Sequence, residues 1–132
     1  MSDTTRLKAL KIALVVVGVT FIGGIYLLMM IWPSGWTWHS GHSDYPLMIV
    51  GVYATLGVFL LMAARDPEKH RSLIQFAIWS SVVHAAIMAV QAFGAGNHGH
   101  LTGDVPALFI VAAVLAVLMP RRSEAVAARL AA

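Results

Sequence analysis

Four long apolar runs divide the chain and predict four membrane-spanning helices. They cover residues 10–32, 46–64, 72–93 and 105–119. An α-helix rises about 1.5 Å per residue, so about 20 apolar residues cross the roughly 30 Å hydrocarbon core of a bilayer. The fourth run is shorter than this and needs residues from its flanks. The pattern therefore predicts an all-α fold, an integral membrane four-helix bundle made by one domain over residues 1–122.

The composition supports this fold class and excludes several others. Hydrophobic residues make up 59% of the chain and charged residues 11%, against about 45–50% and about 25% in a typical soluble domain. This hydrophobicity also excludes intrinsic disorder. The chain has no cysteine, so disulfides, thiolate metal sites and cysteine nucleophiles are absent. The first run is too long for the core of a signal peptide, and we interpret it as a retained span.

The basic residues form three groups, which four spans place on one side of the membrane. The groups are Arg6, Lys8 and Lys11; Arg65, Lys69 and Arg71; and Arg121, Arg122 and Arg129. The positive-inside rule then predicts a multi-pass protein of a bacterial inner membrane with both termini cytoplasmic and a short cytoplasmic tail over residues 123–132. An aromatic belt marks the opposite, outer boundary: Trp32, Trp36, Trp38 and Tyr45. Because the bases lie at helix ends, they indicate the lipid bilayer and not nucleic acid as a partner.

The two outer connections resemble each other. Residues 39–46 and 98–106 each hold two histidines, a glycine and an Asp-x-Pro sequence before an apolar span. One interpretation is a tandem helical-hairpin repeat whose two hairpins enter the membrane from the same side. The other is that aspartate and proline are favoured at the start of any helix, as a cap and as a first-turn residue. The sequence leaves both interpretations open.

Histidines and carboxylates concentrate on the outer side and form a candidate metal site. Its members are His39, His42, His98, His100, Asp44 and Asp104. Neutral imidazole and carboxylate suit zinc and copper(II), and the His-x-x-His and His-x-His spacings let two rings reach one ion. The alternative is a pair of solvated, glycine-containing loops that bind no metal.

His84 lies inside the third apolar run. An ionisable side chain is costly there, so a functional role is the first hypothesis. Met88 follows one turn further along the same helix face. Thioether and imidazole together suit copper(I), and the two residues extend the candidate metal site into the membrane.

A second interpretation of His84 is a binding pocket or a proton relay. Ser80, His84 and Gln91 share one face of the predicted helix and form a polar stripe that faces the bundle interior or a partner. Tyr26 and Tyr53 are candidate hydrogen-bond partners of His84. These five residues are therefore candidate ligand- or cofactor-binding residues.

Several activities lack the residues that they need. A proton-coupled exporter generally needs an intramembrane carboxylate, and the four apolar runs contain no aspartate or glutamate. Haem b between helices usually uses two intramembrane histidines, and the runs contain one. No phosphate-binding glycine loop, HExxH sequence or nucleophile elbow is present, so we assign no catalytic residue. Rows of small residues predict close helix packing and favour a homo-oligomer or a subunit of a larger membrane complex.

Five segments carry a resemblance that covers residues 8–122. They are residues 32–36 (WPSGW), 49–57 (IVGVYATLG), 64–67 (ARDP), 79–84 (WSSVVH) and 103–108 (GDVPAL). In these segments the chain resembles a family of small uncharacterised bacterial inner-membrane proteins with four spans. Its layout is more distantly similar to the DoxX-like group, some members of which are linked to quinone or sulfur redox chemistry. The first resemblance implies the topology and no activity, and the second implies the architecture alone.

Three functions therefore stay open. The first is a membrane protein that binds copper or zinc through its outer histidines and His84. The second is a non-catalytic accessory or structural subunit of a membrane complex. The third is a small pore or a quinone- or lipid-binding bundle built on the polar stripe.

Metal content tests the first of these functions. We expect the purified protein in mild detergent to carry near-stoichiometric copper or zinc by mass spectrometry. The metal should be lost in His84→Ala or in a variant without the four outer histidines, because each removes ligands that suit these ions. A wild-type protein that takes up nothing after loading with Cu(I), Cu(II) and Zn(II) would contradict this function.

Overall fold

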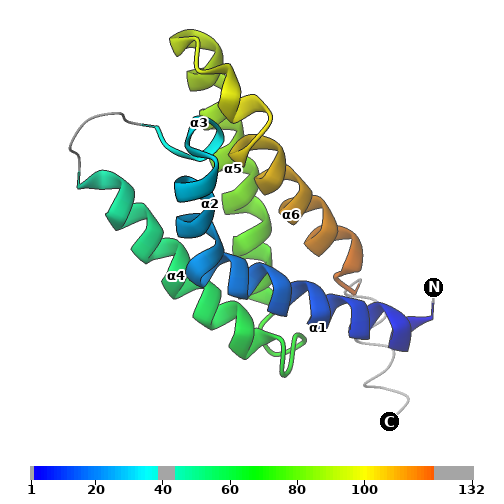
Figure 1. Cartoon of the computed structure of the whole chain (residues 1–132). Helices are drawn as coiled ribbons and strands as arrows, with labels where there is room; N and C mark the ends of the chain where they lie inside the picture. Colours follow the sequence, from blue (N-terminus) through cyan, green and yellow to red (C-terminus); the bar gives the residue numbers. More distant parts are fainter. Residues whose placement is uncertain (1, 39–43, 121–132) are drawn as a thin grey trace.

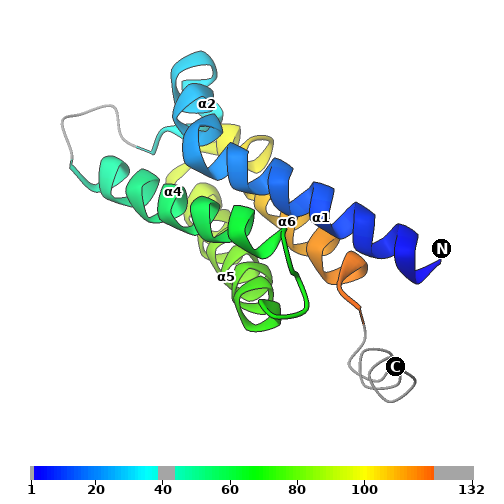
Figure 2. The same cartoon turned by 90° about the horizontal axis from the view of Figure 1, so that it is seen from below.

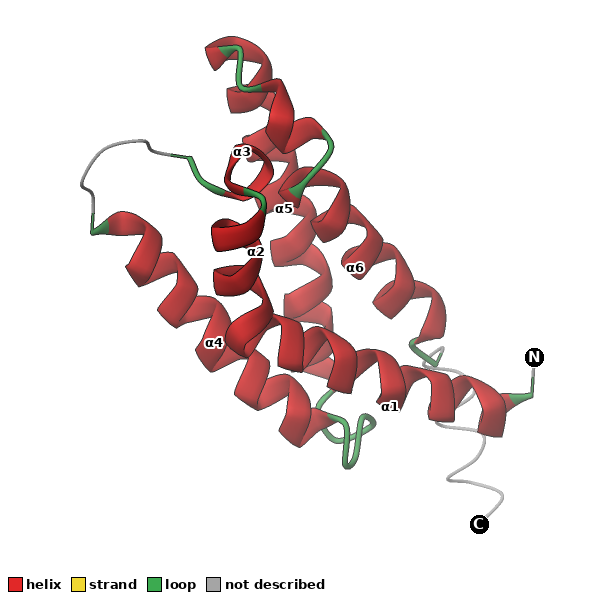
Figure 3. Ribbon diagram, viewed as in Figure 1, coloured by secondary structure: helices red, strands yellow, loops and turns green. Residues whose placement is uncertain are grey.

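In the computed structural model, which describes residues 2–38 and 44–120, every regular element is a helix (Figure 1; Figure 3). Four of the elements are long α-helices, and the rest are short helical segments between or within them. In chain order they are α1 (Asp3–Val19), the π-helix η1 (Thr20–Gly24), α2 (Ile25–Ile31), α3 (Pro33–Trp36), α4 (Tyr45–Ala63), α5 (Arg71–Ala95), the 3₁₀-helix η2 (His98–Leu101) and α6 (Asp104–Leu118).

Four helical stretches are long and apolar enough to cross a membrane. They are Asp3–Ile31, Tyr45–Ala63, Arg71–Ala95 and His98–Leu118. The prediction of four apolar helices is confirmed, although the first begins before its apolar run. The fourth gains its length from η2, which precedes α6. The tail over residues 123–132 and the basic group Arg121, Arg122 and Arg129 lie outside the described residues, and the sidedness of the termini stays a prediction.

The end of the bundle nearest the described ends of the chain is a close-packed aliphatic core. Its largest fully buried side chains come from all four long helices: Leu10, Leu14, Leu60, Ile74 and Leu115. Figure 2 shows α1 lying across the bundle, where it contacts both α4 and α6. Dispersion between such closely packed side chains holds helices together where lipid removes the hydrophobic driving force between them.

Small residues let α5 approach α6, as the sequence predicts. Ser81 and Ala85 on α5 and Ala112 on α6 are buried between the helices. The opposite face of α5 carries large exposed apolar side chains, among them Trp79 and Val90. A helix that buries its small residues and exposes its large apolar ones is arranged for a lipid surround.

Two arginines close the carboxyl-terminal end of α6. The guanidinium of Arg6 donates to the carbonyl of Val117 at 2.6 Å, and that of Arg71 donates to the carbonyl of Pro120 at 2.6 Å. Cations are favourable at this end of a helix, where the last carbonyls lack partners. The contacts bring the first two basic groups together at one end of the bundle. In the same end loop, the hydrogen bond from Lys69 holds the pKa of Asp66 below its usual value.

A sharp bend in the first span opens the opposite end of the bundle. The chain turns at η1, where the Thr20 hydroxyl donates to the carbonyl of Val16 at 2.8 Å and Gly23 and Gly24 follow (Figure 1). A π-helical turn and a back-bonded threonine are both recognised causes of helix bending. Beyond the bend, α2 diverges from α4, with which α1 and η1 stay in contact.

The crossing of α1 and α4 depends on two glycines that face each other. A Cβ added at Gly18 would lie 2.9 Å from the Gly57 carbonyl oxygen, and one added at Gly57 would meet the Gly18 carbonyl oxygen. The obstacle is backbone in both cases, so no side-chain rotation relieves it. The absence of a side chain at these positions therefore sets the distance between the two helices.

Gly57→Ala should lower the free energy of unfolding by about 1–3 kcal/mol, because the added methyl group forces the two backbones apart. The measurement is unfolding of the detergent-solubilised protein with denaturant, followed by circular dichroism. The matched control is Gly51→Ala on the same helix, where an added Cβ meets nothing within 4 Å. Gly51→Ala should be neutral or stabilising by up to about 1 kcal/mol, since alanine favours the helix. Equal effects of the two substitutions on the free energy of unfolding would show that the backbone contact at Gly57 does not determine the stability of the helix crossing.

Candidate functional site

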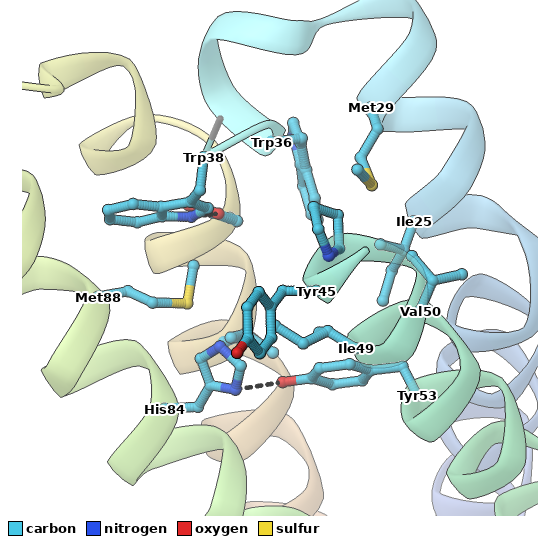
Figure 4. Close-up of a pocket in the computed structure, with 13 residues that line it drawn as sticks. Ile25, Met29, Trp36, Trp38, Tyr45, Ile49, Val50, Tyr53, His84 and Met88 are labelled. Carbon is cyan, nitrogen blue, oxygen red and sulfur yellow. Dashed lines mark hydrogen bonds between the residues drawn. The ribbon is translucent and has the colours of Figure 1, made fainter. Parts of the chain in front are cut away.

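A cavity of about 170 Å³ lies between α2, α4, α5 and the start of α6, where the bend separates α2 from α4 (Figure 4). Its walls are mostly aliphatic, aromatic and thioether side chains. Two tryptophans from the segment after the first span close it on one side, and Met88 and His84 on α5 form another side. The cavity lies at the end of the bundle opposite the two arginines.

His84 reaches this cavity and pairs with Tyr53. The Tyr53 hydroxyl lies 2.9 Å from His84 Nδ1 (Figure 4). The Phe21 ring packs edge-on against Tyr53, with 4.8 Å between the ring centroids. If tyrosine donates, the histidine carries its proton on Nε2; if the histidine donates, the hydroxyl proton is left for another acceptor. In either tautomer the pair retains one further donor and one further acceptor. Of the two tyrosines that the sequence offered as partners, the structure selects Tyr53.

Asp104 is the second polar group of the cavity, and it is 5% exposed. Its Oδ2 accepts a hydrogen bond from Trp38 Nε1 at 2.9 Å and lies 2.9 Å from His100 Nδ1. The rings of Trp38 and His100 stack, with centroids 3.9 Å apart and planes 21° from parallel. Asp104 opens α6 without capping it, so the side chain is used for these tertiary contacts instead. One carboxylate therefore joins the start of α6 to the neighbouring turn that carries His100 and to the distant segment that carries Trp38.

Glycines allow the tryptophan segment to dock on η2. A Cβ at Gly99 would meet the Ser34 carbonyl, and one at Gly103 would meet the backbone of Gly35. The contacts bring α3 directly onto the turn that carries His100. This close backbone approach is what places the Trp38 ring over His100.

Two buried polar atoms of the cavity wall have no hydrogen-bond partner among the described residues. They are Asp104 Oδ1 and Trp36 Nε1. A buried polar atom left without a partner costs about 1–3 kcal/mol. Both residues line the cavity. A ligand that offers a donor to the carboxylate and an acceptor to the indole would satisfy both atoms.

The polar stripe predicted on α5 is brought together only in part. Ser80 is half-buried beside His84 in a shallower adjoining hollow, and its hydroxyl donates to the carbonyl of Ala77. Gln91 is exposed and does not line the cavity. Tyr26 is also largely exposed, at 49%. His84 and Tyr53 are therefore the predicted binding residues that line the cavity, whereas the sequence indicated Trp36 only as part of the aromatic belt.

The predicted metal ligands do not converge within the described part of the chain. His84 and Met88 share the cavity wall, and His100 contacts Asp104. His98 lies apart, edge-on to Phe93, and Asp44 is exposed. No group of three histidine, aspartate or glutamate side chains suited to a metal occurs among the described residues, and His39 and His42 lie outside them. Metal binding stays a prediction.

The four apolar runs hold no carboxylate, but the helical stretch that contains the fourth run also contains Asp104. It belongs to the membrane-length stretch His98–Leu118 and is buried. The apolar run begins one residue later, so counting hydropathy alone places the carboxylate at the boundary. The signal that could have found it is its spacing of four residues from His100, which puts the two side chains on one helical face.

Gly99→Ala should separate Trp38 from His100, because the new methyl group overlaps the Ser34 backbone. We expect Trp38 emission to shift to longer wavelength as the ring loses its stacked, half-buried site. The measurement is fluorescence in a background where the other three tryptophans are phenylalanine. Gly94→Ala is the matched control, since an added Cβ there meets nothing within 4 Å. An unchanged Trp38 spectrum in Gly99→Ala would refute the docking role of this glycine.

Comparison with known proteins gives a family without an assigned activity. No curated protein and no solved structure matches the chain. One family description does, over residues 4–129, which confirms the uncharacterised family expected from the sequence. The DoxX-like architecture and the bacterial origin stay predictions. The chain belongs to the family of unknown function DUF6632.

Proposed function

We propose that the protein binds a small membrane-soluble molecule of the quinone or quinol class in the cavity between α2, α4, α5 and α6. The observation that carries this proposal is a pair of buried atoms that have no hydrogen-bond partner among the described residues, Asp104 Oδ1 and Trp36 Nε1, in a mostly apolar wall. Binding sites for small molecules typically combine an apolar enclosure with a few such polar groups.

The polar groups of the wall match the chemistry of a quinol ring. A hydroxyl can donate to Asp104 Oδ1, and a ring oxygen can accept from Trp36 Nε1. The Tyr53–His84 pair supplies one donor and one acceptor more, in either tautomer. Aromatic and methionine side chains suit the two apolar faces of such a ring.

Size and charge narrow the class of ligand. A dry cavity of about 150 Å³ in another protein takes up benzene, so about 170 Å³ accommodates one six-membered ring. Among the described residues, no lysine or arginine lines the cavity, which disfavours the phosphate of a lipid headgroup. A quinone-type ring needs hydrogen bonds but no cation, and it fits this lining better.

The route of entry also favours a molecule dissolved in the bilayer. Tyr45 and Ile49 line the cavity and are 73% and 48% exposed on α4. The cavity therefore opens sideways, between α2 and α4, onto a surface of membrane-spanning helices. In this proposal both termini are cytoplasmic in a bacterial inner membrane, so the cavity lies in the outer half of the bilayer. A homo-oligomer or a larger complex is compatible with it.

Binding of a short-chain benzoquinol and of its quinone, measured by isothermal titration in nanodiscs, tests the proposal. Asp104→Asn places an amide donor where the ligand needs an acceptor, and Trp36→Phe removes the indole donor. Each should weaken quinol binding about 10-fold or more, equivalent to at least about 1.4 kcal/mol. Trp79→Phe, on the exposed face of α5, should leave binding unchanged.

The outcomes are distinct. If the wild-type protein binds neither form, or if Asp104→Asn and Trp36→Phe bind as well as the wild type, the proposal is wrong. A parallel loading with Cu(I) and Zn(II) separates the metal hypothesis. Stoichiometric metal uptake that is lost in His84→Ala, with no quinol binding, would favour the metal site instead.

A further inference from the structure

A second, polar hollow lies directly behind the wall of the cavity. It has a volume of about 410 Å³ and is formed by α3 and the residues after it, the turn that follows α5, and η2. Its lining includes Ser34, Thr37, Asn97 and His98. The Trp38 ring lines both spaces, Asp104 lines the cavity and His100 lines the hollow. The hydrogen-bonded unit of Asp104, His100 and Trp38 is therefore the partition between them.

We infer that the Asp104–His100 pair conducts protons between the ligand cavity and the outer hollow. Asp104 lines the cavity, and among the described residues its Oδ1 has no hydrogen-bond partner. Its Oδ2 lies 2.9 Å from Nδ1 of His100, a buried residue that lines the hollow. The pair is a continuous chain of titratable groups across a partition that is otherwise aromatic and backbone.

The transfer is balanced in protons and moves no electron. A proton from the hollow binds His100 Nε2 and gives an imidazolium ring. The ring then passes its Nδ1 proton to Asp104 Oδ2, which leaves a neutral histidine and a neutral carboxylic acid. Asp104 can give this proton to a group in the cavity, and the same steps run in reverse when a ligand hydroxyl releases one. Only the identity of that ligand rests on the proposed function.

The surroundings favour this path over others. Trp38 donates to the same Oδ2 and fixes the carboxylate without being able to carry a proton itself. In the described part of the chain, fully buried aliphatic side chains fill the opposite end of the bundle, which disfavours a proton path to Asp104 from that end. The other titratable groups on the two spaces are Tyr45 and Tyr53 of α4, His84 of α5 and His98 of η2. Among the residues that line these spaces, α2 and α3 contribute none.

The test follows protonation of Asp104 without any ligand. The protein in nanodiscs is subjected to a rapid pH jump, and the carbonyl stretch of the carboxylic acid is followed by time-resolved infrared spectroscopy. The band is assigned by its absence in Asp104→Asn. The key variant is His100→Asn, whose amide N–H can still donate to Oδ2 but cannot relay a proton. Protonation of Asp104 should slow by about 100-fold or more, the range in which a positioned acid–base group acts.

A matched control separates a relay from a structural contact. His98→Asn alters a histidine of the hollow outside the pair. It should leave the protonation rate within about threefold of the wild-type rate, well short of the effect of a lost acid–base group. If His100→Asn does not fold by circular dichroism, His100→Gln replaces it. An unchanged rate in the folded His100 variant, or an equal loss in His98→Asn, would overturn the inference.

Quinol binding, measured separately, keeps the two proposals distinguishable. His100→Asn should bind the quinol within about threefold of the wild type, because Asp104 Oδ1 and Trp36 are unchanged and a shift that small is under about 1 kcal/mol. A slow protonation rate without quinol binding would support the relay and refute the quinol. Normal quinol binding with an unchanged protonation rate in the His100 variant would support the quinol site and refute the relay.

Discussion

The carboxylate of Asp104 is the interaction on which the outer end of the molecule depends. It is buried, and its hydrogen bonds to Trp38 and His100 tie the segment after the first span to the turn before the last one. Removing water from a carboxylate is expensive unless hydrogen bonds compensate for the loss. Here one oxygen is compensated from within the protein and the other is not. This asymmetry gives the site its chemistry, because Asp104 lines the cavity and its Oδ1 has no hydrogen-bond partner among the described residues.

The cavity itself is a consequence of helix geometry. Gly18 and Gly57 bring α1 and α4 into backbone contact at their crossing, and the π-helical turn immediately after it redirects the first span. Without the bend, the first span would continue along α4, and its side chains would fill the space that now separates α2 from α4. Because of the bend, α2 diverges from α4. The aromatic segment after α2 packs on η2, where Gly99 and Gly103 allow its backbone to approach closely. The space between this segment, α4 and α5 is the cavity.

Much of the fold could be predicted from the sequence, because a lipid bilayer restricts the structures that an apolar segment can adopt. In a bilayer every backbone polar group needs an internal partner, so an apolar run of sufficient length has few alternatives to a helix. The same constraint makes an isolated ionisable side chain conspicuous, which is why His84 was a candidate from the start. Tyr53 was one of two possible partners, and sequence spacing could not choose between them because they lie on different helices. The predicted outer metal ligands show the opposite case. His98 and His100 are close in sequence but make different contacts, His98 with the Phe93 ring and His100 with Asp104.

The sequence by itself determined the fold class, the four spans, the grouping of bases near helix ends and the functional interest of His84, because these follow from hydropathy and charge along one chain. Only the tertiary structure decided that Asp104 is a buried member of a span, that Trp36 and Trp38 are walls of a site and not simply a membrane belt, and that Tyr53 is the partner of His84. Each depends on which helices meet and where one of them bends. These contacts join residues more than 30 positions apart, and the backbone approach at glycines that permits them leaves no periodic signal in the sequence.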